Sequence, residues 1–105
     1  MTRLVEILKV LSDETRFKII KLLAKNSFCV GALAKRLRIT ESAVSQHLKI
    51  LKNVDLVHAE KQGYYTHYTV KQYVLKNVAN EISRLSDSIT SNNKKCLSKT
   101  SKGGN

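Results

Sequence analysis

Cysteine, acidic residues and long apolar runs are all scarce in this chain of 105 residues. The two cysteines, Cys29 and Cys96, lie too far apart to form the framework of a disulfide-stabilised domain. No apolar run approaches the roughly 18 residues that a membrane-spanning helix requires. The 8 Asp plus Glu stand against 19 Lys plus Arg, which gives a formal net charge of +11. This imbalance favours a polyanionic partner, either nucleic acid or an anionic membrane surface.

Recognisable catalytic motifs are also missing. We find no glycine-rich phosphate loop, no motif of paired carboxylates and no cysteine–histidine spacing typical of a nucleophilic site, so the chain is not expected to be an enzyme. The N-terminal segment MTRLVEILKV is amphipathic and contains an acid, unlike a signal peptide. A cytoplasmic protein is therefore expected. No membrane partner is expected, because the lysines near the C-terminus lack an apolar face and would bind a membrane only weakly.

The first part of the chain has the apolar spacing of helices. The length fits one domain, whose thin core a second copy of the chain could help to cover. Residues 4–11 carry leucine and isoleucine at helical intervals, which predicts a first helix. Ser12 is expected to cap a second helix, which should bury Phe17, Ile20 and Leu23.

A helix-turn-helix is predicted in the middle of the chain. The segment NSF (26–28) interrupts the helical pattern, and VGALAKRL (30–37) forms a short third helix. Residues 38–40 make a tight connection, at the end of which Thr40 caps a fourth helix, ESAVSQHLKILKN (41–53). Two short helices joined by such a turn form the motif.

The fourth helix has two contrasting sides. Val44, Leu48 and Leu51 share an apolar side, which must face the preceding helices. The opposite side carries short hydroxyls near its start and lysines further along. Its members are Ser42, Ser45, Gln46, Lys49, Lys52 and Asn53. His47 lies off this polar side, and its position predicts a histidine at the edge of the core.

The polar side of this helix suits entry into the major groove of DNA. Small serine side chains let the backbone approach, and Gln46 can offer a bidentate pair of hydrogen bonds to adenine. Lys49 and Lys52 can reach phosphates or guanine. An ordinary solvated helix face would look similar. The preceding short helix, the tight turn, the hairpin described next and the positive charge together favour DNA.

After the fourth helix the apolar spacing changes to that of strands. VHAEK (57–61) and YYTHYTV (64–70) are expected to pair across Gln62 and Gly63, because Gly63 supplies the positive φ of a tight hairpin. One face of the hairpin then carries Val57, Ala59, Thr66, Tyr68 and Val70. The hairpin serves as the wing of a winged helix-turn-helix.

Polar side chains of the hairpin leave two further possibilities. The expected pairing places His58 opposite His67, with Glu60 on the same outer face, and three such groups can hold a metal ion. A solvated strand face is the preferred interpretation. Tyr64 and Tyr65 at the tip are expected to contact the DNA backbone or the minor groove.

A long last helix is predicted from about Lys71 to Ile89. An apolar stripe runs along it through Val74, Val78, Ile82, Leu85 and Ile89. Residues 90–105, TSNNKKCLSKTSKGGN, contain four lysines, no acid and no apolar pattern, which predicts a disordered basic tail. Residues 1–89 are then one domain for DNA binding and dimerisation. Its class is mainly α with a β-hairpin wing (α+β), in the order α-α-α-α-β-β-α.

The successive motifs of the chain resemble those of the ArsR/SmtB family of winged-helix repressors. They are LSDETRFKIIKLL, FCVGALAKRL, TESAVSQHLKILKN and GYYTHYTV, and SAVSQHLKIL is the most specific part. The resemblance covers residues 1–89 and implies a homodimer that represses transcription from a double-stranded DNA operator until an inducer releases it. Two positions depart from the pattern. Asp55 stands where members often have glycine, and Arg38 stands where many helix-turn-helix turns carry glycine, which Arg replaces at some energetic cost.

The resemblance and the polar surfaces together assign residues to two interfaces. The expected DNA-binding residues are Thr40, Ser42, Ser45, Gln46, Lys49, Lys52, Lys61, Gln62 and Tyr64. The expected dimer interface joins the first and last helices through Leu4, Leu8, Val74, Val78, Ile82 and Leu85.

The metal sites known in the family are incomplete in this chain. Where arsenite-type members carry Cys-Val-Cys, this sequence has Cys29 followed by Val30 and Gly31, and a soft three-coordinate site needs more thiolates. The zinc-type site of the last helix is not expected either, because residues 71–89 contain neither His nor Cys.

The two thiols leave the inducer open. Cys96 is flanked by lysines, which favour a reactive thiolate, so Cys29 and Cys96 could share a soft metal or metalloid ion, arsenite-like, or oxidise together. The simpler interpretation, which the wide spacing favours, makes Cys29 a small buried hydrophobe and Cys96 an incidental residue. No other cofactor is expected.

Two alternatives to an inducible repressor remain at this point. One is a winged-helix module that binds protein and not specific DNA, and the other is a constitutive DNA-binding regulator without an inducer. Phosphate contacts release counterions, so a steep salt dependence of binding to duplex DNA would separate DNA binding from the first alternative.

Overall fold

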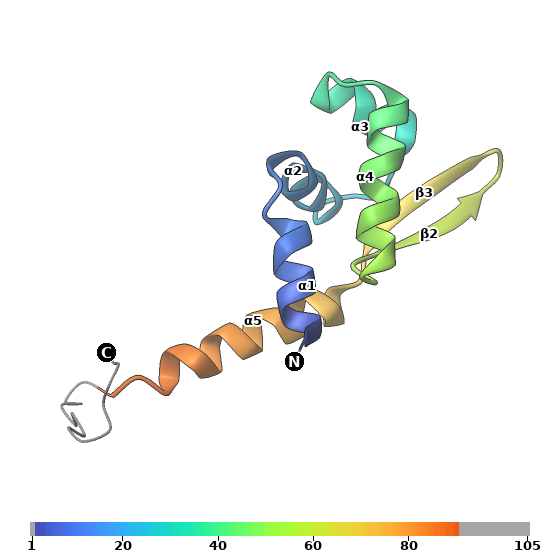
Figure 1. Ribbon diagram of the computed structural model, residues 1–105. Helices are drawn as coiled ribbons and strands as arrows, with labels where there is room; N and C mark the ends of the chain where they lie inside the picture. Colours follow the sequence, from blue (N-terminus) through green and yellow to red (C-terminus); the bar gives the residue numbers. More distant parts are fainter. Residues whose placement is uncertain (1, 91–105) are drawn as a thin grey trace.

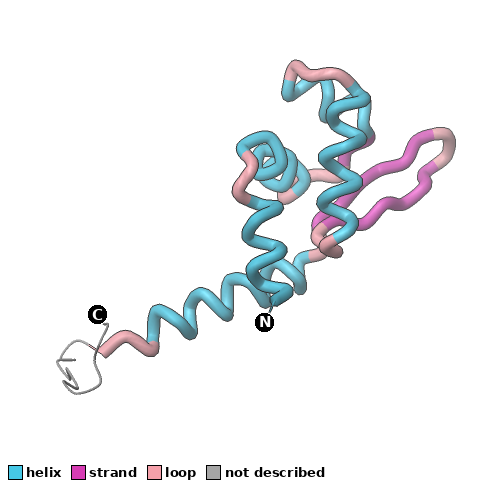
Figure 2. The backbone as a smooth tube through the Cα atoms, viewed as in Figure 1, coloured by secondary structure: helices cyan, strands magenta, loops and turns pink. Residues whose placement is uncertain are grey.

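The computed structural model describes residues 2–90 and has the winged helix-turn-helix architecture (Figures 1 and 2). Its elements are α1 (Thr2–Leu11), α2 (Glu14–Leu23), β1 (Phe28–Cys29), α3 (Val30–Leu37), α4 (Glu41–Asn53), β2 (Val57–Gln62), β3 (Tyr65–Val70) and α5 (Gln72–Asp87). The predicted class and the predicted order of helices and hairpin are confirmed, with β1 as an addition. The predicted basic tail, including Cys96, lies outside the described residues apart from its first position. Among the helices of residues 2–90, none has the length and apolar character to cross a membrane.

The core lies where α1 to α4, the base of the sheet and the start of α5 meet. Its most completely buried side chains are Ile19, Leu33, Val44, Leu48, Leu51 and Leu56. Burying an aliphatic side chain of this size contributes roughly 1.5–3 kcal/mol, so these few residues account for much of the stabilisation of a small domain. Val44, Leu48 and Leu51 are buried as their helical spacing predicts.

The start of α2 differs from the prediction. Asp13, not Ser12, is the N-cap, and its Oδ2 accepts a hydrogen bond from the backbone N–H of Arg16 at 3.0 Å. This bond is the main cause that lowers the pKa of Asp13 below its usual value. The Ser12 hydroxyl is already engaged in the last turn of α1, where it donates to the carbonyl of Lys9 at 2.8 Å. The cap therefore passes to the next residue with a suitable side chain.

The side of α2 that is buried also differs from the predicted one by a rotation about the helix axis. Ile19, Ile20 and Leu23 are buried, whereas Phe17 is 49% exposed and the prediction that it is buried is wrong. Ile19 and Leu23 are one helical turn apart with Ile20 beside them, so the buried arc is centred away from Phe17. The ring of Phe17 instead lies 6.0 Å from the Nζ of Lys21.

The sheet has three antiparallel strands in the order β1-β3-β2. β1 pairs Phe28 with Tyr68 and Cys29 with His67. Sequence spacing could not predict this strand, because two residues show no alternation. It matters for the site, because it attaches the start of α3 to the wing.

The hairpin keeps the predicted residues on one face, but its register and its turn differ from the prediction. Pairing across Gln62 and Gly63 would set Val57 opposite Tyr68, whereas Val57 lies opposite Val70. The two residues between the strands are Gly63 and Tyr64, and Gly63 has the expected positive φ of 65°.

The register corrects the predicted opposition of the two histidines, although they still share a face with Glu60. His58 lies opposite Thr69, and His67 lies opposite Glu60, so the two histidines are not opposed. Within residues 2–90, no three His, Cys, Asp or Glu side chains are grouped so that they could hold a metal ion.

The apolar stripe of α5 is divided between the core and the surface. Val74 and Val78 are buried, whereas Ile82, Leu85 and Ile89 are 44%, 65% and 73% exposed. Figure 1 shows why: α1 crosses the first part of α5, and the rest of the helix extends away from the body. The helix ends at Asp87, two residues earlier than predicted.

The turn between α3 and α4 contains a backbone conformation that is unfavourable for its residue. Arg38 has φ 59° and ψ 45°, in the left-handed region, and Ile39 donates its N–H to the carbonyl of Ala34 at 3.2 Å. The energetic cost that the sequence predicted at Arg38 therefore arises from its left-handed backbone, which is unfavourable for a residue with a side chain.

Replacing Arg38 by glycine should stabilise the protein by about 1 kcal/mol. Left-handed conformation costs an L-residue roughly 1–2 kcal/mol, and the greater freedom of glycine in the unfolded chain offsets part of the gain. Thermal unfolding followed by circular dichroism should show a Tm several degrees higher. As the control, Gly63→Ala introduces the same strain at φ 65° and should lower the Tm. A Tm for Arg38→Gly that is equal to or below that of the wild type contradicts this account.

Candidate nucleic-acid interface

The side of α4 that faces away from the core carries a group of polar side chains. The helix begins at Thr40, whose Oγ1 accepts a hydrogen bond from the N–H of Ala43 at 3.0 Å, as predicted. Its apolar side is held in the core, so its rotation about its own axis is determined by packing. The residues that this leaves exposed include the six predicted polar ones, Ser42, Ser45, Gln46, Lys49, Lys52 and Asn53.

These exposed side chains are available to an external partner. In the described part of the chain, none of the six side chains forms a hydrogen bond or an ion pair with another residue. No side chain of residues 2–90 therefore occupies their donors and acceptors. A partner that binds them must provide complementary donors and acceptors, as the edges of DNA bases do.

The wing and α4 border one continuous surface. The wing residues Lys61, Gln62 and Tyr64 are exposed, and Tyr64 is 98% exposed. A hollow of about 230 Å³ separates the tip of the wing from the first turns of α3 and α4, and its lining includes Tyr64, Thr66, Gly31 and Glu41. The start of α4 and the wing tip thus lie on either side of the same depression, with the wing beside the helix in Figure 1.

The charge of this surface is mainly positive. Lys49 and Lys52 extend from α4, and Lys61 extends from the wing. Glu41 is an acid in the first turn of α4, where it complements the positive end of the helix dipole. A carboxylate oxygen of Glu41 would lie 3.3 Å from a Cβ on Gly31, so this side chain leans toward α3.

His47 lies at the edge of the core, as its position on the helix predicts. Its side chain is 24% exposed, and its Nδ1 is 3.3 Å from Nη1 of Arg16 and 4.0 Å from Oδ2 of Asp13. The histidine therefore links α4 to the start of α2. It takes no part in the exposed polar surface.

Cys29 lies near this surface. It is half-buried, carries a free thiol, and lines the hollow between the wing and the starts of α3 and α4. It is paired with His67 across the sheet, and the Nδ1 of His67 is buried without a hydrogen-bond partner in the described structure. Cys96 lies outside the described residues, so the structure does not test whether the two thiols act together.

A polar cluster at the other end of α4 was not predicted. Arg3 of α1 and Lys71 and Tyr73 beside or within α5 contact Val54 and Asp55, which directly follow α4. The one signal in the sequence was Asp55 in place of the glycine common in similar chains. The partners of Asp55 carry no such signal, because the hairpin separates them from it in sequence.

Comparison with known proteins identifies a sequence family. Residues 13–59 match the sequence profile described as "Bacterial regulatory protein, arsR family". The chain is 38% identical over 85 residues to the uncharacterised HTH-type transcriptional regulator MJ1325 of Methanocaldococcus jannaschii, a match that covers 80% of this chain and 91% of the relative.

Of two further relatives, one is named a transcriptional activator and the other a transcriptional repressor. The transcriptional activator HlyU of Vibrio cholerae is 35% identical, over 77% of this chain and 75% of its own length. The transcriptional repressor SdpR of Bacillus subtilis is 31% identical, over 70% of this chain and 82% of its own length.

The fold also matches solved structures. One is the solution structure of the homodimeric winged helix-turn-helix DNA-binding domain of Mb0332 from Mycobacterium bovis, a possible ArsR-family transcriptional regulator. The TM-score is 0.68 at 25% sequence identity, and the match covers 82% of this chain and 80% of that one.

Proposed function

The chain belongs to the ArsR family of bacterial regulatory proteins, and from this premise we propose that it binds operator DNA as a homodimer and represses transcription. Its relatives are transcriptional regulators, and the chain is a regulator and not an enzyme. The observation that carries the proposal is the exposed polar side of α4, which lies beside the wing and is backed by a fully buried apolar side. A protein with this proposed function would act in the cytoplasm.

We propose that some of the exposed residues contact the edges of bases and that others contact phosphates. In the major groove, α4 would present Gln46 to a base edge, with Ser42 and Ser45 allowing close approach. The residues proposed to contact phosphates or the adjacent groove are Thr40, Lys49, Lys52, Lys61, Gln62 and Tyr64. All of these residues are exposed, as contact with DNA requires.

Repression is the preferred outcome of this binding. A dimer that occupies the major groove excludes other proteins from the same DNA, and SdpR is a repressor. HlyU, at 35% identity, is an activator, so activation is the second candidate. The two differ in which operator position the protein occupies and not in how α4 reads it.

Substitution of Gln46 and Lys52 should separate base reading from phosphate binding. On a duplex selected by the wild-type protein from a random-sequence library, Gln46→Ala should cost about 1–3 kcal/mol of binding free energy, and on random DNA it should cost little. Lys52→Ala should weaken both complexes by similar factors and reduce the slope of log K against log[salt] by about one. Fluorescence anisotropy titrations at several salt concentrations measure all of these quantities.

The controls for this experiment distinguish the rival functions. If Gln46→Ala weakens both duplexes equally, Gln46 does not read a base. If the wild-type protein selects no duplex and shows no salt-dependent binding, the alternative of a protein-binding module replaces the proposal.

The proposed homodimer joins α1 and α5 of two protomers. Leu8 of α1 is 38% exposed, and Ile82 and Leu85 continue an apolar surface along α5 that the protomer itself does not cover. Leu4, Val74 and Val78 pack against or within the core beneath this surface. A homodimeric structural relative supports the assignment.

Charges introduced on the exposed stripe should give monomers. The double variant Ile82→Lys, Leu85→Lys places two ammonium groups on the proposed interface but leaves the core intact, because neither side chain is buried. Sedimentation velocity at micromolar concentration should show a dimer for the wild type and a monomer for the variant. Asn80→Lys, Ser83→Lys adds the same charge on the other side of α5 and should remain dimeric. If the wild type itself sediments as a monomer, the dimer proposal is wrong.

An inducer that acts on thiols is the proposed route of release. Cys29 is accessible from a hollow that both the wing and α4 border, so a group bound to its sulfur would disturb the DNA-facing surface. The inducer must bind the free arrangement better than the DNA-bound one, typically by about 1–3 kcal/mol. Either a soft ion shared by Cys29 and Cys96 or their oxidation would have this effect.

Operator release should depend on both cysteines. The complex is titrated with arsenite, zinc, cadmium and a persulfide donor for the wild type, Cys29→Ser, Cys96→Ser and the double variant. We expect one of these reagents to lower operator affinity of the wild type by roughly 5- to 150-fold and to leave the three variants unaffected. A double variant that responds like the wild type excludes the thiols. A wild type that responds to none of the reagents overturns the thiol-sensing proposal and leaves operator binding standing.

A further inference from the structure

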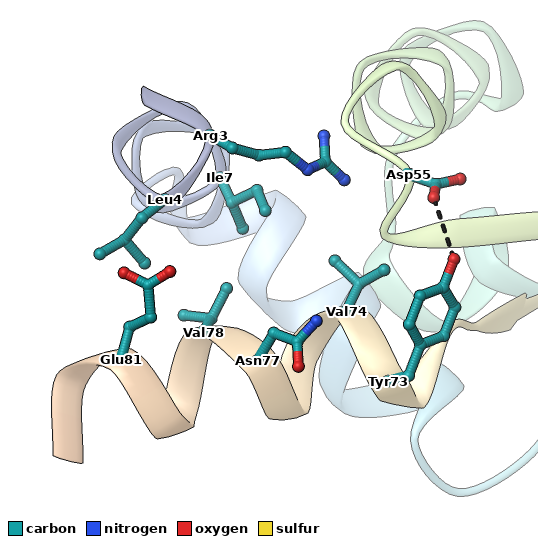
Figure 3. Close-up of a pocket in the computed structure, with 9 residues that line it drawn as sticks. All are labelled: Arg3, Leu4, Ile7, Asp55, Tyr73, Val74, Asn77, Val78 and Glu81. Carbon is teal, nitrogen blue, oxygen red and sulfur yellow. Dashed lines mark hydrogen bonds between the residues drawn. The ribbon is translucent and has the colours of Figure 1, made fainter. Parts of the chain in front are cut away.

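The C-terminal end of α4 is bonded to α1 and to the start of α5. Nη2 of Arg3 donates to the carbonyl of Val54 at 3.1 Å. Nζ of Lys71, the N-cap of α5, donates to Oδ1 of Asp55 at 2.6 Å, and the hydroxyl of Tyr73 donates to Oδ2 at 3.3 Å. We name these five residues the α4–α5 bracket. Figure 3 shows Arg3 and Tyr73 reaching toward the Asp55 loop from α1 and α5, around a cavity of about 250 Å³.

The backbone of the bracket is as constrained as its side chains. The N–H of Leu56 donates to the carbonyl of Leu51 at 3.0 Å, and the N–H of Lys71 donates to the carbonyl of Leu56 at 2.8 Å. Leu56 is completely buried. The end of α4 and the start of α5 therefore meet at Leu56, although the whole hairpin separates them in sequence.

Asp55 holds a backbone conformation that would suit glycine better. Its φ is 65°, in the left-handed region, where glycine has no steric penalty. Aspartate is among the residues that tolerate this region, but it does so less readily than glycine. Here it also supplies the carboxylate that Lys71 and Tyr73 bond. The hydrogen bond from Lys71 lowers the pKa of Asp55 and raises that of Lys71, so both groups are charged at neutral pH.

The ion pair of the bracket contributes little to the stability of the protomer. The Lys71–Asp55 ion pair has side chains that are 30% and 43% exposed, and exposed pairs of this kind contribute little net stability. Glycine at residue 55 would remove the backbone strain at the same time as the ion pair. Asp55 therefore gives the folded protomer little advantage in stability over glycine, which directs attention to a role in binding.

We infer that Asp55 is a positioning residue for operator binding, which fixes each recognition helix relative to the dimer helices. The inference rests on the proposed function, in which α1 and α5 form the dimer interface. In such a dimer, the orientation of α4 on α1 and α5 determines the distance and angle between the two copies of α4. Two half-sites of DNA can be bound together only when that distance matches one helical turn or a multiple of it.

The experiment compares one half-site with two. The probes are a duplex selected from a random-sequence library by the full-length wild-type protein and the same duplex with one half scrambled. Asp55→Gly should bind the scrambled duplex like the wild type and the intact duplex about tenfold more weakly, the range expected for a coupling between sites. Its Tm should equal or exceed that of the wild type, because glycine relieves the left-handed strain, and it should still sediment as a dimer.

Two further variants separate positioning from a structural effect. Asp55→Asn keeps the tolerance for left-handed backbone and can still accept a hydrogen bond from Lys71, so it should recover part of the affinity for the intact duplex. Glu14→Gln breaks a comparable exposed ion pair, with Lys18 at 3.4 Å, away from the bracket and should bind both duplexes like the wild type.

The possible results decide between the inferences. Equal affinity of Asp55→Gly and the wild type for the intact duplex refutes the positioning role and leaves the proposed function standing. Equal losses on both duplexes together with a lower Tm show a purely structural role. If the wild type selects no duplex or sediments as a monomer, the proposed function fails and this inference fails with it.

Discussion

The packing of the apolar side of α4 against the other helices is the interaction on which the rest of the structure depends. Val44, Leu48 and Leu51 are completely or almost completely buried, so α4 cannot rotate about its axis without exposing them to water. The same contacts keep Ser45, Gln46 and Lys49 on the surface. Because the backbone of α4 is already ordered, binding a partner through this polar face requires no further loss of backbone entropy. Such preorganisation favours tight binding by a small domain.

The two ends of α4 transmit its position to different parts of the molecule. Its start borders the wing and Cys29 across a hollow, and its end is held by Asp55 and Lys71 beside α5. In the proposed dimer the first end lies near the thiol and the second near the partner protomer. A signal at either end can therefore change operator affinity through a small change in the orientation of α4, without loss of the fold.

Sequence spacing predicted most of the fold and the exposed face, because these depend on long regular patterns. The bounds of α4 follow from the Thr40 cap and an apolar pattern that persists over three turns, and the apolar face of the hairpin follows from alternation. The predicted pairs of the hairpin are wrong, because a shift of two positions leaves the alternation unchanged. The failures have local causes. β1 is too short for a pattern, and the cap passed to Asp13 because Ser12 was engaged in α1. The contact of Lys71 with Asp55 has no signal at all, since only the folded hairpin brings them together.

Protection of guanine N7 from methylation by dimethyl sulfate tests the central claim most directly, because N7 lies in the major groove. With the selected duplex and the wild-type protein, the account predicts two groups of protected guanines, with their centres separated by about one helical turn or a multiple of it. Protection should be lost in the Ile82→Lys, Leu85→Lys variant at concentrations that saturate the wild type. Full binding of the duplex with every guanine N7 still reactive would contradict the account, because α4 would then lie outside the major groove.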